Sequence, residues 1–428
     1  MNAMNTWTRR VAVVTAAAGL GLAALQAHAS PRGSEFDASL GPASGGMEGV
    51  AVARPVDSIG MLFSNPATLG QADSDHEFLI GGTFVSPDLD ASGQPTELDG
   101  SPPDGDPSPP LTGAFDGESD LDASVAPNAA AVQRITDDLV AGMGISAISG
   151  LGGDFRDVQG LPNLISDLKI FGANAGVAYD VTDRLTVGAV GTLGIGQLQM
   201  GLTDSGGTVN NFGIGGTGGA TYDAGPFVLG AAYKSELDIT YDNVIQTGTD
   251  SFSNLTLQQP REVQAGIATS DALLDDTLIA AEFRWKNWSD ASGYSSVWQD
   301  QFLGSVGAQH SFGQGPGAIT VRTGYTYSSD LAKDSDELGS SFGSVTQVSA
   351  PDSNQALPVT STFLQLAQTT ITDGYWSQSV SLGFGVNITE GLRFDLHGSY
   401  GFDGEEQIGR FEADGSIWQL GGGLTWNL

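Results

Sequence analysis

The chain has 428 residues and contains no cysteine, which excludes a small fold held together by disulfides. It carries 50 Asp and Glu residues against 16 Lys and Arg residues, a formal net charge of −34. Binding to nucleic acid requires clustered basic side chains, so we expect no nucleic-acid partner. The length is sufficient for a large core or a large closed sheet.

The first 29 residues have the features of a secretory signal peptide. Arg9 and Arg10 form a positive start, residues 11–26 are apolar, and residues 27–29 match an A-x-A cleavage site. The alternative, an N-terminal membrane helix, is disfavoured because the run is short and rich in Ala and Gly. No other segment approaches 18 consecutive apolar residues. We therefore expect an exported protein without a helical membrane span.

Residues 30–75 are rich in Gly, Ser and Ala and show no alternation. They include the run SIGMLFSNPATLGQ at 58–71. Pro66 fixes φ and removes a backbone donor, so Asn65, Pro66 and Ala67 predict a tight turn. A simple linker turn is the alternative interpretation. The apolar neighbours of this turn could line a cavity; they are Met61, Leu62, Phe63 and Leu69.

From residue 76 onward, apolar and polar residues alternate with period two. In 277–288, Ile279, Phe283 and Trp285 oppose Glu282, Arg284 and Lys286. The same pattern places Leu237 and Ile239 on the apolar face of 226–241, and places Arg393 and Asp395 on the polar face of 391–402. A soluble sandwich also alternates, but these segments are about twice the usual strand length, which is what a tilted strand needs to cross a bilayer.

Several aromatic residues lie near the predicted strand ends, as in the interfacial girdles of membrane barrels. They are Trp285, Trp288, Tyr325, Tyr327, Trp376, Tyr400, Phe402 and Trp426. In lipid every backbone polar group must be paired, so the strands must close into a barrel. We therefore predict an all-β fold: an antiparallel transmembrane β-barrel.

The count of alternating segments is fourteen, an even number as in bacterial barrels. We predict strands at 76–88, 124–136, 138–155, 168–181, 184–200, 209–222, 226–241, 256–270, 277–289, 300–313, 317–329, 375–388, 391–403 and 416–428. Short turns alternate with longer links, which predicts short periplasmic turns, long extracellular loops and both chain ends inside. The stretch 87–123, which contains the long link 89–123, has ten acidic residues, no basic residue and seven prolines. We interpret it as a solvated loop, with cation binding as the alternative.

The NPA run at 65–67, ahead of fourteen strands, resembles the FadL/TodX family of outer-membrane transporters for long-chain fatty acids and other hydrophobic compounds. Residues 126–155, 173–191 and 231–241 resemble further segments of that family, in the same order. The resemblance implies a signal peptide at 1–29, an N-terminal hatch at 30–75 inside the lumen and a barrel at 76–428. It also implies passive uptake of a hydrophobic small molecule, without an enzymatic activity, a cofactor or a metal.

In the family, a kink in the third strand opens the barrel wall so that the ligand leaves sideways into the bilayer. The matching segment here is Ser149, Gly150, Leu151, Gly152 and Gly153, where glycines weaken pairing and permit a bulge. Glycine is frequent throughout this chain, with 61 residues, so the triplet by itself is a modest signal.

Fatty-acid transporters of the family hold the ligand carboxylate with basic side chains, but the matching positions here are Leu202 and Gln299. This difference favours neutral hydrocarbons or aromatics. Other charged residues are predicted in the lumen: Lys234, Glu236, Glu282, Arg284, Lys286, Arg322, Arg393 and Asp395. The bases among them could replace the missing ones, or could pair with Glu282, Glu236, Asp238 and Asp395. We favour pairing.

Two other functions compete with this interpretation. A general water-filled porin for polar solutes would have a polar lumen without an apolar plug. An outer-membrane lipase would need a Ser/His/acid arrangement, and the three histidines after the signal peptide (His76, His310 and His397) show none. We expect a monomer in the outer membrane of a Gram-negative bacterium, in contact with its lipids and lipopolysaccharide.

Overall fold

The computed structural model describes most of the chain after residue 35. The described residues are 36, 38–72, 74–93, 114–159, 161, 164–201, 207–248, 251–334, 336–341, 343–349, 356–371 and 377–428. The predicted signal peptide, Leu202 and Trp376 lie outside the described residues.

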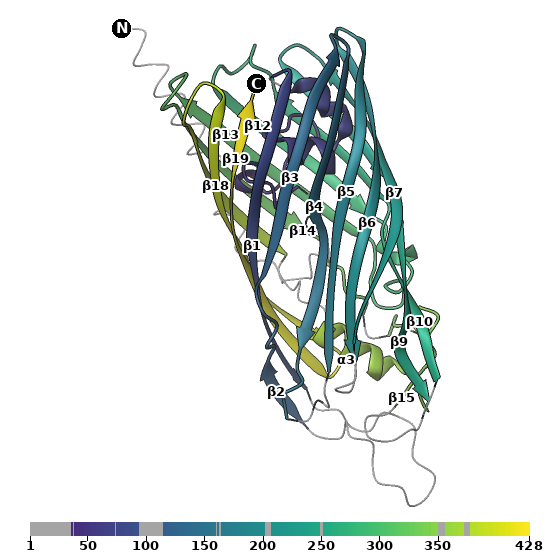
Figure 1. The fold of residues 1–428 in the computed structure, drawn as a ribbon. Coiled ribbons are helices and arrows are strands. Elements are labelled where there is room, and N and C mark those ends of the chain that lie inside the picture. The colour runs from purple at the N-terminus through teal and green to yellow at the C-terminus, as the bar shows by residue number, and fades with distance from the viewer. Residues whose placement is uncertain are drawn as a thin grey trace, which may run out of the picture.

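Fourteen antiparallel strands form one closed barrel (Figure 1). The last strand pairs with the first, with Trp426 opposite Phe78. The predicted all-β class and strand number are confirmed. Closure removes the sheet edges, as a sheet surrounded by lipid requires. The strands are β1 (His76–Gly93), β3 (Ser124–Thr136), β4 (Leu139–Asp154), β5 (Ile165–Thr182), β6 (Leu185–Gly201), β7 (Thr208–Asp223), β8 (Phe227–Lys234), β11 (Glu262–Thr269), β12 (Thr277–Lys286), β13 (Gln301–Phe312), β14 (Ile319–Ser328), β17 (Gln378–Asn387), β18 (Leu392–Ile408) and β19 (Phe411–Asn427).

The two faces of the barrel wall differ in chemistry. Large apolar side chains such as Ile214, Phe283 and Leu382 are exposed on the outer face. On the inner face, Arg284 and Asp395 are buried. An apolar outer face on a closed barrel is the arrangement that a bilayer stabilises. None of the described helices is both long enough and apolar enough to span a membrane.

The two ends of the barrel carry different connections. One end has short links such as 137–138 and 183–184, and we call it the short-turn end. The C-terminus lies there (Figure 1). The opposite, long-loop end carries additional elements: β2 (Phe115–Glu118), β9 (Leu237–Gly248), β10 (Ser251–Gln259), η3 (Trp288–Asp290), β15 (Gln347–Ser349), β16 (Ala356–Pro358) and α3 (Ser361–Ile371).

Part of the acidic segment 87–123 is strand and not loop. β1 continues to Gly93, and β2 pairs with this extension, with Glu118 opposite Asp90. The prediction of a loop throughout was therefore wrong at both ends of the segment.

The predicted strands at 226–241 and 256–270 were wrong in extent. β8 ends at Lys234, and the chain then forms a separate hairpin, β9–β10, before β11 returns to the barrel. Leu237 and Ile239 are buried against the inner side of β6 and do not face lipid. Gly194 and Gly196 make room for them, since a Cβ at either glycine would lie 2.8 Å from one of these side chains. The chain leaves the barrel sheet after Lys234 but keeps its period of two, so the alternation in the sequence could not reveal the separate hairpin.

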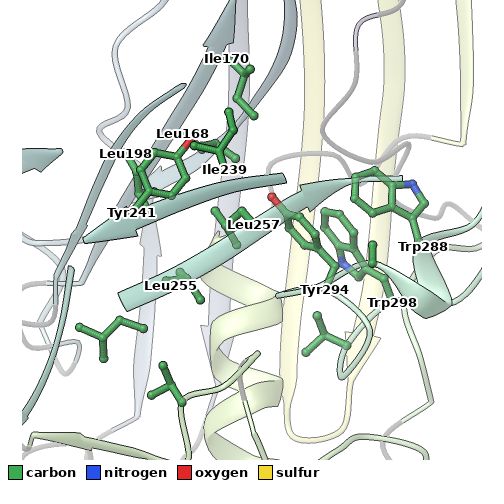
Figure 2. Close-up of a cluster of buried hydrophobic side chains, with 14 of the residues drawn as sticks. Leu168, Ile170, Leu198, Ile239, Tyr241, Leu255, Leu257, Trp288, Tyr294 and Trp298 are labelled. Carbon is green, nitrogen blue, oxygen red and sulfur yellow. The ribbon is translucent and has the colours of Figure 1, made fainter. Parts of the chain in front are cut away.

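A large apolar cluster fills the long-loop end, and we call it the cap cluster (Figure 2). The β9–β10 hairpin supplies Ile239, Tyr241, Leu255 and Leu257, which lie between wall residues and an aromatic trio. The trio is Trp288, Tyr294 and Trp298; Tyr294 stacks on Trp298 at 4.4 Å, and Trp288 meets Trp298 edge-on at 4.7 Å. The predicted place of Trp288 in an interfacial girdle was therefore wrong, because it is fully buried.

Asp300 holds the loop that carries this trio. Its carboxylate accepts hydrogen bonds from Ser289 Oγ at 2.6 Å, Asn287 Nδ2 at 2.9 Å and Trp285 Nε1 at 3.0 Å. Burial by itself raises the pKa of Asp300, but the hydrogen bonds from Ser289, Asn287 and Trp285 outweigh burial and lower the pKa below its ordinary value. Because the pKa of Asp300 is lower in the folded protein than in the unfolded chain, its ionised carboxylate stabilises the fold at pH values above the ordinary pKa. This contribution is lost as the pH falls through the folded-state pKa.

The change Asp300→Asn should lower the stability of the loop by about 1 kcal/mol, because a charged hydrogen-bond acceptor is replaced by a neutral amide. Near-ultraviolet circular dichroism of the aromatic residues should be weaker in the variant at neutral pH. As pH falls below about 4, the wild-type signal should fall while the variant changes less. Identical pH profiles for the two proteins would show that Asp300 does not hold the loop.

Candidate functional site

Residues 38–72 lie inside the barrel toward the short-turn end, and we call this segment the hatch (Figure 1). It contains three short helices: η1 (Ser44–Met47), α2 (Ser58–Phe63) and η2 (Pro66–Gln71). Most of its residues are buried. Its backbone polar groups are therefore largely out of reach of water and must be satisfied by other groups of the protein.

One carboxylate joins two parts of the hatch. Asp57 caps α2, since its Oδ1 accepts a hydrogen bond from the Gly60 N–H at 2.9 Å. Its Oδ2 accepts from the N–H groups of Ala43 at 3.0 Å and Ser44 at 2.8 Å. Asp57 thereby links the segment around η1 to α2 by contacts within the hatch, without a contribution from the wall.

The NPA run fixes the hatch to the wall. Asn65 Oδ1 accepts from the Ala67 N–H at 3.1 Å and caps η2, with Pro66 at the first helical position, where no N–H is needed. Asn65 Nδ2 donates to the carbonyls of Val52 at 2.7 Å and of Ala220, on β7, at 3.1 Å. The turn is thus bonded both to the hatch and to the barrel.

The apolar hatch residues pack mainly against the wall. Leu62 and Leu69 fill the space left by Gly142 and Gly144 on β4, where an added Cβ would lie within 3 Å of their methyl groups. Met61 and Phe63 belong to the same buried cluster. The four hatch residues that were predicted to line a cavity are therefore largely packed in a buried cluster.

Charged side chains on the inner wall hold the hatch backbone. Glu282 Oε2 accepts from the N–H groups of Ala51 at 3.0 Å and Val52 at 3.2 Å, and its other oxygen pairs with Arg284. Arg284 also donates to the Gly49 carbonyl at 3.0 Å. Removing one partner of a buried pair of this kind costs about 3–5 kcal/mol, because the other charge is left uncompensated.

A second group of charges lies on β14 and β18. Asp395 binds Arg322 at 2.8 Å and Arg393 at 2.7 Å, one base on each oxygen. Arg393 also donates to the Val56 carbonyl of the hatch at 3.0 Å. Within the described residues, no group of three or more His, Asp or Glu side chains is placed to hold a metal ion.

The remaining predicted charges divide between lumen and surface. Lys234 Nζ binds Glu262 at 2.9 Å, and the strand register places Glu262 opposite both Lys234 and Lys286. Glu236 was wrongly predicted in the lumen, because β8 ends before it and it lies exposed in the turn to β9. Gln299 donates to the Ala332 carbonyl at 3.1 Å. Of the four bases for which pairing was favoured, Arg284 pairs with Glu282, and Arg322 and Arg393 pair with Asp395. The fourth, Lys286, lies opposite Glu262 in the strand register.

The barrel wall is interrupted between β3 and β4. Their pairing ends at Ala129 and Ile145; beyond this point residues 124–128 of β3 pair only with β1, and β4 pairs only with β5. Ile148 forms a bulge in β4, between Ala147 and Ser149. Its carbonyl accepts a hydrogen bond from the Phe36 N–H at 3.3 Å, so a residue from outside the barrel strands contacts the unpaired edge.

A cavity of about 270 Å³ lies at this interruption, and we call it the wall cavity. Apolar residues from both sides line it, among them Phe36, Val125, Ala126, Leu168 and Phe171, together with Ser149 and Gly150. Three charged residues, Asp122, Asp167 and Lys169, also line it, and Lys169 Nζ binds Asp167 at 2.6 Å. The ring of Phe36 lies against Gly150, where a Cβ would come within 2.9 Å of it.

The predicted run 149–153 begins one residue after the bulge. Gly150, Leu151, Gly152 and Gly153 are regularly paired with β5. Gly153 allows the last turn of α3 to approach, since a Cβ there would overlap the Thr370 carbonyl oxygen. The bulge residue itself, Ile148, was missed because nothing in its sequence surroundings marks it more strongly than the glycines nearby.

A smaller cavity of about 40 Å³ lies inside the barrel, and we call it the inner cavity. Phe63 of the hatch, Ile148 and Leu237 form its apolar side, and Asn174, Thr192, Thr217, Lys234 and Gln259 form its polar side. Ile148 lines the inner cavity, and its neighbours Ala147 and Ser149 line the wall cavity. The bulge therefore lies between the two.

Comparison with solved structures shows the same fold over nearly the full length. The toluene transporter TodX of Pseudomonas putida superposes with a TM-score of 0.65 at 18% identity, covering 92% of this chain and 99% of TodX. A FadL homologue of Pseudomonas aeruginosa gives 0.64 at 14% identity, with 94% and 100% covered. The toluene transporter TbuX of Ralstonia pickettii gives 0.61 at 19% identity, with 92% and 99% covered.

The sequence by itself matches no family model and no curated protein. At identities below 20%, the structural likeness establishes the fold of these outer-membrane channels and leaves the activity to be argued from the site.

The change Gly219→Ala tests how the hatch is seated. A Cβ at Gly219 on β7 would lie 1.9 Å from Asn65 Oδ1, so the NPA turn must move, at a cost of about 1–3 kcal/mol. We expect a several-fold rise in ion conductance across planar bilayers, because a displaced hatch admits water.

Gly218→Ala is the matched control, because an added Cβ at the adjacent residue has nothing within 4 Å. It should leave the conductance unchanged. Equal conductance of the two variants would show that the hatch does not depend on the contact between Asn65 and β7.

Proposed function

We propose that the chain belongs to the FadL/TodX family and is a passive outer-membrane channel for hydrophobic small molecules. In this proposal residues 1–29 are a signal peptide, residues 30–75 form the hatch domain and residues 76–428 form the barrel. The short-turn end faces the periplasm and the long-loop end faces the outside. The activity is transport and not catalysis.

The observation that carries the proposal is the wall cavity. Among the described residues, the hatch packs inside the barrel toward the short-turn end and the cap cluster packs at the long-loop end, an arrangement that disfavours a wide aqueous path along the axis. In the proposal, the interruption between β3 and β4 is the path from the mainly apolar wall cavity to the face that lipid would cover, which is supported by the position of the cavity where the pairing ends. A polar solute gains nothing from such a path, whereas a hydrophobic one gains about 0.8 kcal/mol per buried CH₂.

The route proposed for the ligand has three steps. A hydrophobic molecule leaves water at the long-loop end and enters the cap cluster. It then passes the bulge at Ile148 and reaches the wall cavity, which Leu168 of the cap cluster also lines. Displacement of the Phe36 ring from Gly150 lets it continue between β3 and β4 into the bilayer.

The charges of the lumen favour a neutral ligand. Three basic groups on the inner wall, at Arg284, Arg322 and Arg393, are each paired with a carboxylate and bonded to protein oxygen atoms. A ligand carboxylate would have to break these contacts and compete with Glu282 or Asp395. The toluene transporters TodX and TbuX share the fold, and the ligand in their names is also neutral.

The change Ser149→Trp tests the sideways exit. The indole should fill the wall cavity and reduce uptake of toluene and of an alkane into reconstituted liposomes several-fold, because the route is occupied. Met143→Trp is the control, since Met143 is on the regularly paired part of the same strand and exposed on the outer face.

Equal uptake by the two variants would contradict a sideways exit. A third outcome concerns the porin alternative: if sugars of ordinary porin size enter at the same rate as toluene, the channel is a general porin and the proposal fails. Correct assembly of both variants is verified first by heat-modifiable migration in electrophoresis.

A further inference from the structure

Two residues that line the inner cavity carry buried polar atoms without a hydrogen-bond partner among the described residues. Both amide atoms of Gln259, a side chain 4% exposed, lack a hydrogen bond to any described residue. Asn174, 6% exposed, donates its Nδ2 to the Leu62 carbonyl at 2.7 Å, but its Oδ1 has no described partner. Leaving such groups buried and unsatisfied costs about 1–3 kcal/mol each, so a ligand that satisfies them would be stabilised.

These atoms define the chemistry of the group they would bind. Gln259 offers one acceptor and an N–H₂ donor, and Asn174 offers a second acceptor. A hydroxyl can accept a hydrogen bond from Gln259 Nε2 and donate its one proton to Asn174 Oδ1, so it engages both residues and leaves only Gln259 Oε1 without a partner. A hydrocarbon satisfies neither, and a carboxylate has no proton to give to Asn174 Oδ1 or Gln259 Oε1.

The charges near the inner cavity disfavour an anion further. Lys234 lines the cavity, but its ammonium group binds the buried carboxylate of Glu262 at 2.9 Å. Glu262 also accepts a hydrogen bond from Gln264 Nε2 at 2.8 Å. A ligand carboxylate would therefore have to compete with Glu262 for the ammonium group of Lys234, in addition to the cost of leaving water.

The size of the inner cavity limits what enters it. A volume of about 40 Å³ accommodates a few water-sized groups, so it holds a head group and not a whole hydrophobic molecule. The remainder of the ligand needs apolar space, and the wall cavity lies on the other side of the bulge at Ile148.

We propose that the inner cavity is a head-group site for a neutral amphiphile, a long-chain alcohol or an alkylphenol, whose hydroxyl binds Gln259 and Asn174 while its tail extends past Ile148 into the wall cavity. This inference rests on the proposed transport of hydrophobic molecules, and it narrows the class of ligand.

The test compares three probes of equal chain length: 1-dodecanol, dodecane and dodecanoate. Binding to the full-length purified channel in detergent is measured by displacement of a fluorescent alkyl probe, and uptake is measured in liposomes. The wild type should bind dodecanol about tenfold more tightly than dodecane or dodecanoate.

The variant Gln259→Leu should lose this preference, with dodecanol binding about tenfold weaker and dodecane binding unchanged or stronger. Because neither amide atom of Gln259 bonds to the described protein, the change should not disturb folding. Gln258→Leu is the control at the adjacent residue: it removes a glutamine that bonds to Asp238 and to the Ser292 N–H and does not line the inner cavity, so the variant, once shown to be folded, should keep the preference.

Three outcomes separate this inference from the proposed function. If no probe binds or enters, the transport proposal itself fails. If all three bind alike, or if Gln259→Leu leaves the dodecanol preference intact, transport stands and the head-group site is wrong. A preference for dodecanoate would overturn the neutral-ligand argument and the head-group site together.

Discussion

The fold depends on one requirement, that the backbone polar groups of a lipid-facing sheet find partners within the protein. The barrel meets it by closing, with β19 paired to β1 along the whole of β1. The interruption between β3 and β4 is a local departure from this rule, where residues 124–128 have a neighbour on one side only. The bulge at Ile148 and the Phe36 N–H bonded to its carbonyl show how the protein covers the exposed edge.

The same requirement explains the use of charge inside the barrel. The hatch has little regular secondary structure, so its N–H and carbonyl groups depend on side chains of the wall. Glu282 accepts two of its N–H groups, and Arg284 and Arg393 donate to its carbonyls. The lumen charges are therefore already engaged in holding the hatch, which is why they are poor candidates for recognising a charged ligand.

The sequence predicted much of the barrel because period-two alternation is a direct consequence of one wet or buried face and one lipid face. It failed where an element kept the alternation but left the wall, as at Leu237 and Ile239 in the β9–β10 hairpin. Burial of Trp288 in the cap cluster could not be predicted either, because an aromatic residue at a strand end fits both an interface and a loop core.

For the candidate site, the sequence identified the residue types better than their contacts. Asn65 and Pro66 predicted the turn through their capping chemistry, but the bond from Asn65 to the Ala220 carbonyl depends on distant chain segments. The glycines at 150–153 marked the right strand, while the bulge lies at Ile148, where pairing on both sides decides its position. Gln259 was not predicted at all, since only the folded hairpin places it in the inner cavity.

The most direct test of the sideways route is to find where a ligand in transit touches the protein. An alkane that carries a photoreactive diazirine would be added to the channel in liposomes, activated, and its attachment sites mapped by mass spectrometry. We predict labels on residues of the wall cavity, such as Val125 and Phe171, on both sides of the interruption. Labels confined to the hatch and to the pocket at the short-turn end, near Arg54 and Asp271, would contradict the account, because they would show that the ligand crosses the hatch instead.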